Sequence, residues 1–460
     1  MKITILLLAL FFGDVNCHGE DGYIDGDFRI QIDRSQDCFL EDVSENKFQF
    51  RRRFTTCDPK DYAFERGTTQ FIIAGGDKFT RDFKNNIVRK DMKFGLLFDT
   101  DHPNPPEESE QTHFKILADD AYVSHDVTTY WCVIKKVPEI VSKQKHHITK
   151  IMPHIQKGNE HLVHHMEPVY YPPEAGRPIG GKGGHKYLKV EIHYNNPEML
   201  TDIIDNSGID ITITKKLRKY DAGIMELGLI YSDANSIPPG QSAFTMTGYC
   251  VADCTNKLPE QGIHIFATQL HAHMSGRKLF TSHYRHGVKI GEINRDNHYS
   301  PHWQHVVHLQ PYVHVFPGDV LTTTCVYETR SQNNVVLGGY GIEDEMCVNY
   351  IYYYPLSDIE VCKSAIDNNT LHDYFEHQHG IKRRNLPIHE KYKSIEWNTK
   401  NTLSLKEIYA AAPLNMHCLK HDGKLFPGHP LNWTGIPQPY VHKTPITPQR
   451  DDYECSALND

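Results

Sequence analysis

The sequence predicts a mainly β protein built from stacked antiparallel β-sandwiches. Short runs with alternating apolar residues recur along the chain, for example Phe28, Ile30 and Ile32, and a period of two is typical of half-buried strands. The 25 Tyr and 20 Phe supply the aromatic side chains that strands favour. Few stretches show the helical period, and the clearest of them, over 404–412, predicts a short helix. These observations indicate sandwiches that follow one another along the chain.

The length of the chain allows two or three domains, since 460 residues exceed the size of one ordinary hydrophobic core. The acidic, proline-rich segment 101–112 is the clearest linker. We therefore divide the chain into a leader, three β domains and a C-terminal extension, at 1–17, 18–110, 115–224, 225–370 and 371–460.

The N-terminus has the composition of a secretory signal peptide. A positive start is followed by an apolar run over 3–12 and a cleavage-like pattern that ends at Cys17. The run is too short to span a bilayer, so we expect a soluble protein of the secretory pathway, in a vesicle lumen or outside the cell. Membrane association through an uncleaved signal is the alternative. Sequons at Asn368 and Asn432 predict glycosylation and fit secretion.

Charge and cysteine content narrow the class of protein further. The net charge is −9 without a strong basic run, which argues against a nucleic-acid partner. Eleven cysteines in a secreted chain indicate disulfides, whose pairing the spacing does not fix. Cys250 and Cys254 also have the spacing of a zinc knuckle, but an oxidising compartment favours disulfides, and we expect no structural zinc. The oligomeric state is open, a homo-oligomer included.

Two histidines two residues apart, His271 and His273, form the leading candidate metal motif. On a strand, residues i and i+2 point to the same face, so both imidazoles can converge on one ion. Met346 could add a thioether, and two imidazoles with a thioether suit copper, particularly Cu(I), better than zinc or magnesium. The alternative is two strand histidines on a solvated face and a methionine in a core.

A second histidine set lies upstream and consists of His164, His165 and His193. His193 leaves the apolar face of its expected strand. Adjacent strand residues point in opposite directions, so His164 and His165 reach one ion only where the chain bends. The similar pair His146 and His147 has no nearby partner, and we interpret it as surface.

Long stretches of the chain resemble the ascorbate-dependent type II copper monooxygenases, most of all their dopamine and tyramine β-hydroxylase branch. The matching stretches are 56–62, 128–132, 158–167, 170–176, 191–197, 222–229, 262–278, 296–301 and 345–350, within a resemblance that covers roughly residues 45–440. The resemblance implies tandem, jelly-roll-like copper domains, each carrying one copper, which face each other across an open cleft. A DOMON-like β-domain would precede them.

Carried over position by position, the resemblance implies two coppers per chain. It assigns ligands of an electron-storing copper to His164, His165 and His193, and ligands of an oxygen-binding copper to His271, His273 and Met346. Tyr130 and His271 match positions that the family treats as catalytic. Ascorbate would supply two electrons, one at a time, and molecular oxygen would be the co-substrate.

The implied reaction adds a hydroxyl to the β (benzylic) carbon of a phenylethylamine. Tyramine giving octopamine and dopamine giving noradrenaline both stay open, because one ring hydroxyl separates the two substrates. A cationic amine needs a carboxylate near the cleft, and Glu167 and Glu226 are the candidates. Tyr350 is the candidate for the ring or its hydroxyl. For Glu226 the alternative is a surface carboxylate.

The resemblance also implies a disulfide framework. It pairs Cys57 with Cys455, Cys250 with Cys362, Cys254 with Cys418, and Cys325 with Cys347. The last pair would fix the strand that bears Met346.

Two departures from the family stand out. The family has a much longer segment after the first histidine pair, whereas here Met166 is followed almost directly by Tyr170. The upstream copper domain should therefore lack strands and expose an edge or apolar patch beside Tyr170 and Tyr171. Cys132 would lose its partner. The DOMON-like domain is also truncated, since too few strands precede Cys57 to close a sandwich.

Three functions follow from these observations. The leading one is an amine β-hydroxylase. The second is a peptidylglycine-type amidating hydroxylase, which shares the copper ligands. The third is a secreted copper-binding homologue, catalytically impaired by the missing segment.

Overall fold

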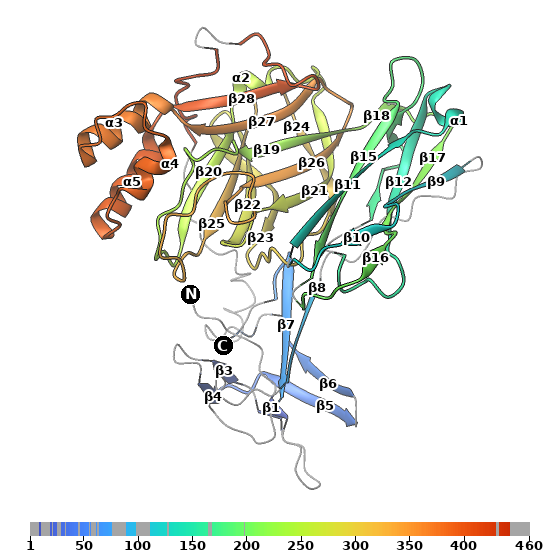
Figure 1. Cartoon of the computed structure of the whole chain (residues 1–460), viewed down its shortest axis with the longest axis horizontal. Helices are drawn as coiled ribbons and strands as arrows, with labels where there is room; N and C mark the ends of the chain where they lie inside the picture. Colours follow the sequence, from blue (N-terminus) through green and yellow to red (C-terminus); the bar gives the residue numbers. More distant parts are fainter. Residues whose placement is uncertain are drawn as a thin grey trace, which may run out of the picture. The chain divides into compact units, whose positions relative to one another are not determined.

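In the computed structural model, the chain folds into two compact units (Figure 1). The N-terminal unit contains residues 1–100, 296–298 and 443–460, and the larger unit contains 101–295 and 299–442. The structure describes residues 9–10, 19–20, 22–24, 29–32, 34–44, 47–54, 56, 61, 64–75, 89–97, 111–126, 128–163, 168–196, 198–428 and 432–441. Every structural statement below concerns these residues.

The described strands of the N-terminal unit form antiparallel pairs. These are β1 (Ala9–Leu10) with β2 (Gly19–Glu20), β3 (Gly22–Ile24) with β4 (Ile30–Ile32), β5 (Cys38–Ser44) with β6 (Lys47–Arg52), and β7 (Thr68–Gly75) with β8 (Arg89–Leu96). The alternating pattern of the sequence thus predicted strand structure correctly here. Within this unit the Thr68 hydroxyl donates a hydrogen bond to the Asp296 carboxylate at 2.5 Å.

The first half of the larger unit, residues 111–221, is called the upstream region. Its main sheet has the order β18-β14-β12-β17-β9, with β13 added to β12. The bounds are β9 Gln111–Leu117, β12 His146–His154, β13 Val169–Tyr170, β14 Ala175–Ile179, β17 Gly208–Thr214 and β18 Tyr220–Asp221. Two further antiparallel pairs are β11 (Thr128–Lys136) with β15 (Tyr187–Asn195) and β10 (Ala121–Val123) with β16 (Ile203–Asp205).

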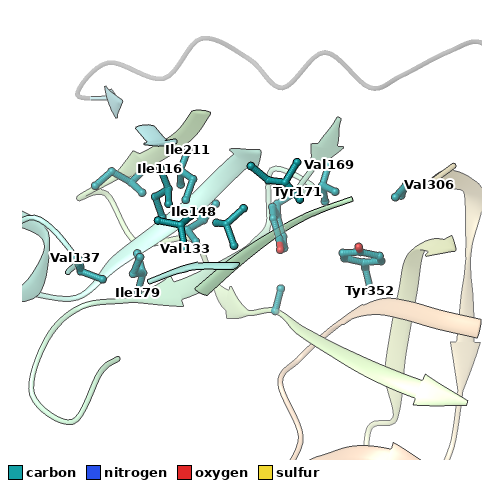
Figure 2. Close-up of a cluster of buried hydrophobic side chains, with 14 of the residues drawn as sticks. Ile116, Val133, Val137, Ile148, Val169, Tyr171, Ile179, Ile211, Val306 and Tyr352 are labelled. Carbon is teal, nitrogen blue, oxygen red and sulfur yellow. The ribbon is translucent and has the colours of Figure 1, made fainter. Parts of the chain in front are cut away.

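The core of the upstream region lies between its sheets. Val133 of β11 and Ile192 of β15 pack in one buried cluster with Ile148 and Ile211 of the main sheet (Figure 2). On β15 the apolar face predicted from the sequence is confirmed, because Val190 and Ile192 are buried while Glu191 is exposed. The outer face of β11 leaves Tyr130 and Ile134 exposed.

The burial of Tyr171 contradicts one expectation that followed from the shortened segment. Tyr171 is buried, and its ring lies 5.7 Å from that of Phe266, in the second half of the larger unit. Figure 2 shows Tyr171 and Tyr352 in the same cluster. No apolar patch is therefore exposed at Tyr171, because the neighbouring region covers it. Three exposed aromatic and aliphatic side chains of the upstream region lie instead on the β11–β15 pair, at Tyr130, Ile134 and Tyr187.

The interpretation of His146 and His147 as surface residues is wrong. Both are buried on β12. The Nε2 atom of His147 lies 2.7 Å from the Asp221 carboxylate, and its Nδ1 atom accepts a hydrogen bond from the backbone N–H of Arg218 at 3.0 Å. His146 Nδ1 contacts the carbonyl oxygen of Gln144 at 2.8 Å. This pair is therefore structural, and the partners of His147 are too far away in sequence for a local pattern to show them.

The second half of the larger unit, residues 223–441, is called the downstream region, and it contains a β-sandwich. One sheet has the order β24-β21-β26-β19-β27-β28 and the other β20-β25-β22-β23. The first comprises β19 Gly223–Leu229, β21 Ile263–His271, β24 Val307–Val315, β26 Val348–Tyr354, β27 Ile359–Ile366 and β28 Leu414–Lys420. The second comprises β20 Phe244–Cys250, β22 Gly276–Arg285, β23 Val288–Asp296 and β25 Val320–Tyr327.

Alternation along β26 decides what each face of the six-stranded sheet contacts. Ile351 and Tyr353 point into the sandwich core, beside Met225 and Leu227 of β19. Tyr352 instead packs in the cluster that contains Tyr171. Because successive strand residues alternate, the even-numbered residues of β26 lie on the face turned toward the upstream region.

Three disulfides join the strands of the downstream region. They pair Cys250 with Cys362, Cys254 with Cys418, and Cys325 with Cys347, as the resemblance implied. Cys250 and Cys254 are therefore disulfide-bonded and do not form a zinc knuckle. The expected pair of Cys57 and Cys455 lies outside the described residues.

The described helices are few and lie mainly after the sandwich strands. They are α1 Glu139–Ser142, α2 Ala252–Thr255, α3 Asn368–His379, α4 Ile388–Lys393 and α5 Thr399–Ala411. Helix α5 confirms the helix expected over 404–412. It begins earlier than expected because Asn398 caps it by accepting a hydrogen bond from the N–H of Asn401. In the described part of the chain, none of the helices is long and apolar enough to cross a membrane.

Candidate metal centres

The leading histidine motif lies at the end of a central strand. His271 is the last residue of β21, and His273 follows two residues later. Their ring centroids are 5.1 Å apart and the ring planes are nearly perpendicular, at 89°. Both side chains are half-buried. The two rings therefore lie close together, as binding to one ion would require.

The second nitrogen of each imidazole is already held by an oxygen. His271 Nδ1 lies 2.6 Å from Gln304 Oε1, and His273 Nδ1 lies 2.9 Å from the carbonyl oxygen of Asp344. Gln304 is oriented in turn, because its Nε2 donates to the carbonyl oxygen of Pro301 at 3.2 Å. Both oxygens can only accept, so each Nδ1 carries the proton and each Nε2 carries a lone pair. This is the tautomer that a metal-binding histidine needs.

Burial keeps His271 neutral. It lowers the pKa of His271 to about 4, although the hydrogen bond to Gln304 raises the pKa in the opposite direction. A neutral imidazole binds a metal ion without first losing a proton. His271 therefore fits copper in both protonation state and tautomer, and His273 fits it in tautomer.

The backbone of Met346 lies near that of His273. In the pairing of β21 with β26, Leu270 is opposite Asn349 and His271 is opposite Val348, where β21 ends and β26 begins. Beyond this pairing, Glu345 Oε2 accepts hydrogen bonds from the backbone N–H groups of both His273 and Met346. Met346 is buried. The three downstream residues proposed from the sequence therefore lie in neighbouring segments of the chain.

One buried carboxylate connects the two ligand segments. Glu345 Oε2 accepts hydrogen bonds from the backbone N–H groups of His273 at 3.0 Å and Met346 at 3.3 Å, and Oε1 accepts from Ser275. Burial raises the pKa of Glu345 to about 7, against the lowering effect of these donors. Glu345 therefore fixes the backbone on both sides of the candidate site.

Tyr299 fixes the residue between the two histidines. Its hydroxyl donates to the carbonyl oxygen of Ala272 at 2.6 Å and accepts from the Ala272 N–H at 2.9 Å. Sequence reasoning missed Gln304, Glu345 and Tyr299. Glu345 lies in the stretch 345–350 and Tyr299 in the stretch 296–301. Both stretches carry the family resemblance, which is the signal that could have pointed to these two residues. Gln304 lies outside the matching stretches and has no such signal.

The upstream candidate site is described in part. His193 lies on β15 opposite Tyr130 of β11, and the two rings stack with centroids 4.4 Å apart and planes 14° apart. His164, His165 and Glu167 lie outside the described residues. Val163 forms an isolated β-bridge with Tyr194. The backbone therefore passes beside β15 immediately before His164, next to the position of His193.

Electrostatics links the upstream and downstream sites. The pKa of His193 is lowered mainly by burial, Glu191 raises it, and the charge of His273 lowers it further. The two imidazoles are therefore within electrostatic reach of each other.

The substrate candidates share the sheet face that carries the histidines. Glu226 of β19 is directly opposite Tyr350 of β26, and Tyr350 is also opposite Gln269 of β21. The Tyr350 ring lies 6.2 Å from that of His271. The Glu226 side chain is about one-third exposed and forms an ion pair with Lys363, so it is not an isolated surface carboxylate.

Comparison with known proteins identifies the family of this chain. Residues 220–375 match the family described as copper type II ascorbate-dependent monooxygenase, C-terminal domain, and residues 114–170 match the N-terminal domain of the same family. Tyramine beta-hydroxylase of Caenorhabditis briggsae is 43% identical, over 98% of this chain and 86% of the relative. Dopamine beta-hydroxylase of Homo sapiens is 37% identical, over 95% and 79%. DBH-like monooxygenase protein 1 of Homo sapiens is 28% identical, over 88% and 76%.

The lengths of these matches bear on the shortened segment. The alignment with the Caenorhabditis briggsae relative extends over 506 positions, more than the 460 residues of this chain, so that relative contains residues without a counterpart here. The match to the N-terminal domain ends at residue 170. The identity and coverage of the relatives show that the chain belongs to the copper type II ascorbate-dependent monooxygenase family.

Proposed function

We propose that this protein hydroxylates the β carbon of a phenylethylamine, with two coppers, ascorbate as the electron donor and molecular oxygen as co-substrate. The observation that carries the proposal is the downstream site. There, the Nδ1 atoms of His271 and His273 are hydrogen-bonded to oxygens, and His271 shares a sheet face with the carboxylate of Glu226 and the ring of Tyr350. The buried Met346 follows Glu345, which accepts hydrogen bonds from the backbones of both Met346 and His273. Relatives at 43% and 37% identity are a tyramine and a dopamine beta-hydroxylase.

In this proposal His271, His273 and Met346 hold the copper that reacts with oxygen. A thioether stabilises Cu(I), which is the oxidation state that must meet oxygen. Gln304 and the Asp344 carbonyl keep each Nδ1 protonated, so that each Nε2 can bind the metal. Bound copper supplies one-electron redox chemistry with oxygen.

His164, His165 and His193 hold the electron-delivering copper in this proposal. An all-imidazole site accepts either oxidation state. Tyr130 stacks on the His193 ring and restricts the plane of this ligand, which is the role we give to this family-matched position.

Glu226 and Tyr350 bind the substrate in this proposal. The carboxylate pairs with the cationic amine, and Tyr350 contacts the ring or its hydroxyl. Tyr350 lies one strand and Glu226 two strands from His271 on the same sheet face, which supports this assignment. Glu167 is a second carboxylate candidate.

The three disulfides and the family support a location in the secretory pathway, because disulfides form and persist mainly in oxidising compartments. We propose a vesicle lumen or the extracellular space as its location. Asn368 and Asn432 are both exposed, as glycosylation requires.

The shortened segment favours a second candidate function, a secreted copper-binding homologue without turnover. Oxygen uptake that depends on ascorbate, measured with tyramine, dopamine and a glycine-extended peptide, decides between the functions. We expect uptake with one or both amines. Uptake with the peptide alone would indicate an amidating hydroxylase, and no uptake in the copper-loaded protein would support the copper-binding homologue.

A further inference from the structure

The two carboxylate oxygens of Glu226 differ in the hydrogen bonds that they accept from the described residues. The hydrogen bonds that described residues make to Glu226 all end at Oε2, from the Tyr231 hydroxyl at 3.2 Å and from the Lys363 ammonium group. The side chain is about one-third exposed. A carboxylate has lone pairs on both oxygens, so Oε1 can accept a further ammonium group.

Lys363 is held in place from several sides. It lies on β27 and is 4% exposed. Its Nζ atom lies 3.5 Å from the centre of the Tyr231 ring, in addition to its contact with Glu226. A buried ammonium group requires a counter-charge, and a ring face attracts it further. Lys363 therefore has one well-defined position, in which it holds Glu226 Oε2.

The open oxygen belongs to the sheet face that carries the candidate copper site. Glu226 is in register with Val361 of β27, and Lys363 is two residues further along the same face. On its other side Glu226 is opposite Tyr350, whose ring contacts that of His271. Tyr231 connects Glu226 with Tyr350, because its hydroxyl bonds Glu226 and also lies 3.5 Å from the Tyr350 hydroxyl.

We propose that Lys363 is a positioning residue for amine binding, which together with Tyr231 holds Oε2 of Glu226 so that Oε1 is presented to the ammonium group of the substrate. The inference rests on the proposed function, since it requires an amine substrate. Without Lys363, the Glu226 side chain would gain rotamer freedom, and amine binding would have to remove that freedom again.

The test compares a cationic substrate with an uncharged one in the copper-loaded full chain. Tyramine carries the amine, whereas 4-ethylphenol keeps the ring and the benzylic carbon without it. In Lys363→Met we expect the KM for tyramine to rise about tenfold, with kcat changed less than about twofold and 4-ethylphenol unaffected. Lys363→Arg should recover part of the loss. Lys289→Met is the matched control, because Lys289 forms an ion pair with Glu292 on β23.

Tyr231→Phe keeps the inference testable if Lys363→Met fails to fold. It removes one Oε2 bond without leaving a charge unpaired, and we expect the KM for tyramine to rise about threefold. Equal losses for tyramine and 4-ethylphenol, or unchanged tyramine KM in both variants, would overturn the inference. Calorimetric binding of tyramine needs no turnover. If the wild type binds tyramine without hydroxylating it and Lys363→Met binds it more weakly, the positioning role stands and the proposed function fails.

Discussion

His271 and His193, one ligand candidate from each site, lie in different surroundings. His271 ends a strand inside a six-stranded sheet, and its ring is fixed by Gln304 while Tyr299 fixes the next residue. His193 lies on a two-stranded sheet, where its ring stacks on that of the half-exposed Tyr130. The comparison teaches that a wide sheet brings several elements to one ligand, and we expect His271 to be oriented before copper binds.

Met346→Ile should have the largest effect, because it removes the sulfur ligand from the better-supported site. We expect hydroxylation to fall by at least about 100-fold, while the upstream site keeps its copper. Activity with tyramine and copper content per chain provide the measurement. Met246→Ile, at a buried methionine of β20, is the control for loss of a methionine. Full activity in Met346→Ile would remove Met346 from the ligand set.

Glu345→Gln tests whether the downstream site is held by its surroundings. Glu345 accepts N–H groups on both oxygens, whereas glutamine has one accepting oxygen, so at least one buried donor loses its partner. We expect a loss of about 1–3 kcal/mol in the free energy of unfolding and weaker copper binding downstream only. Thermal denaturation and copper titration measure the two effects. An unchanged free energy of unfolding and unchanged copper affinity in Glu345→Gln would show that the Glu345 carboxylate does not organise the downstream site.

A pH series tests the burial of His271 in the copper-free protein. Its pKa of about 4 lies below the ordinary 6.5, so the unfolded chain binds this proton more readily. The contribution of the His271 imidazole to the free energy of unfolding is on the order of 2 kcal/mol. It is therefore present above pH 6.5 and is lost as the pH falls toward 4. The pKa of Glu345, raised to about 7, gives the opposite slope, since its contribution is lost as the pH rises from 4.5 to 7.

Because these slopes oppose each other, the informative quantity is the difference between wild type and His271→Asn. We expect the stability advantage of the wild type to grow as the pH rises from 4 to 6.5, as measured by urea unfolding at each pH. A difference that does not change with pH would mean that His271 titrates normally.

Tyr299→Phe should have the smallest effect. It removes the hydroxyl that both donates to and accepts from Ala272, at a cost of about 1–2 kcal/mol in the free energy of unfolding. We expect downstream copper affinity to fall severalfold and upstream affinity to stay constant. An equal fall at both sites would mean that the hydroxyl supports the whole unit and not the ligand segment.

Sequence reasoning predicted the local parts of this arrangement and missed the long-range ones. The spacing of His271 and His273 brings the two rings close together, although β21 ends at His271 and His273 lies just beyond the strand. The apolar pattern around His193 defines its strand correctly. The burial of His147 depends on Asp221, and the orientation of His271 depends on Gln304. These contacts arise from strand order and loop paths, which a local pattern does not contain. The assignment of Met346 likewise came from the family resemblance, since its segment meets that of His273 only in the folded chain.

Stepwise titration of the copper-free protein with Cu(I), followed by X-ray absorption, tests the central claim most directly. If the downstream site is oriented in advance, the first equivalent should bind there with sulfur in the coordination shell. The second equivalent should bind at least about tenfold more weakly and show nitrogen ligands alone. Met346→Ile should abolish the sulfur signal. Equal affinity for both equivalents, or a first equivalent without sulfur, would contradict the account.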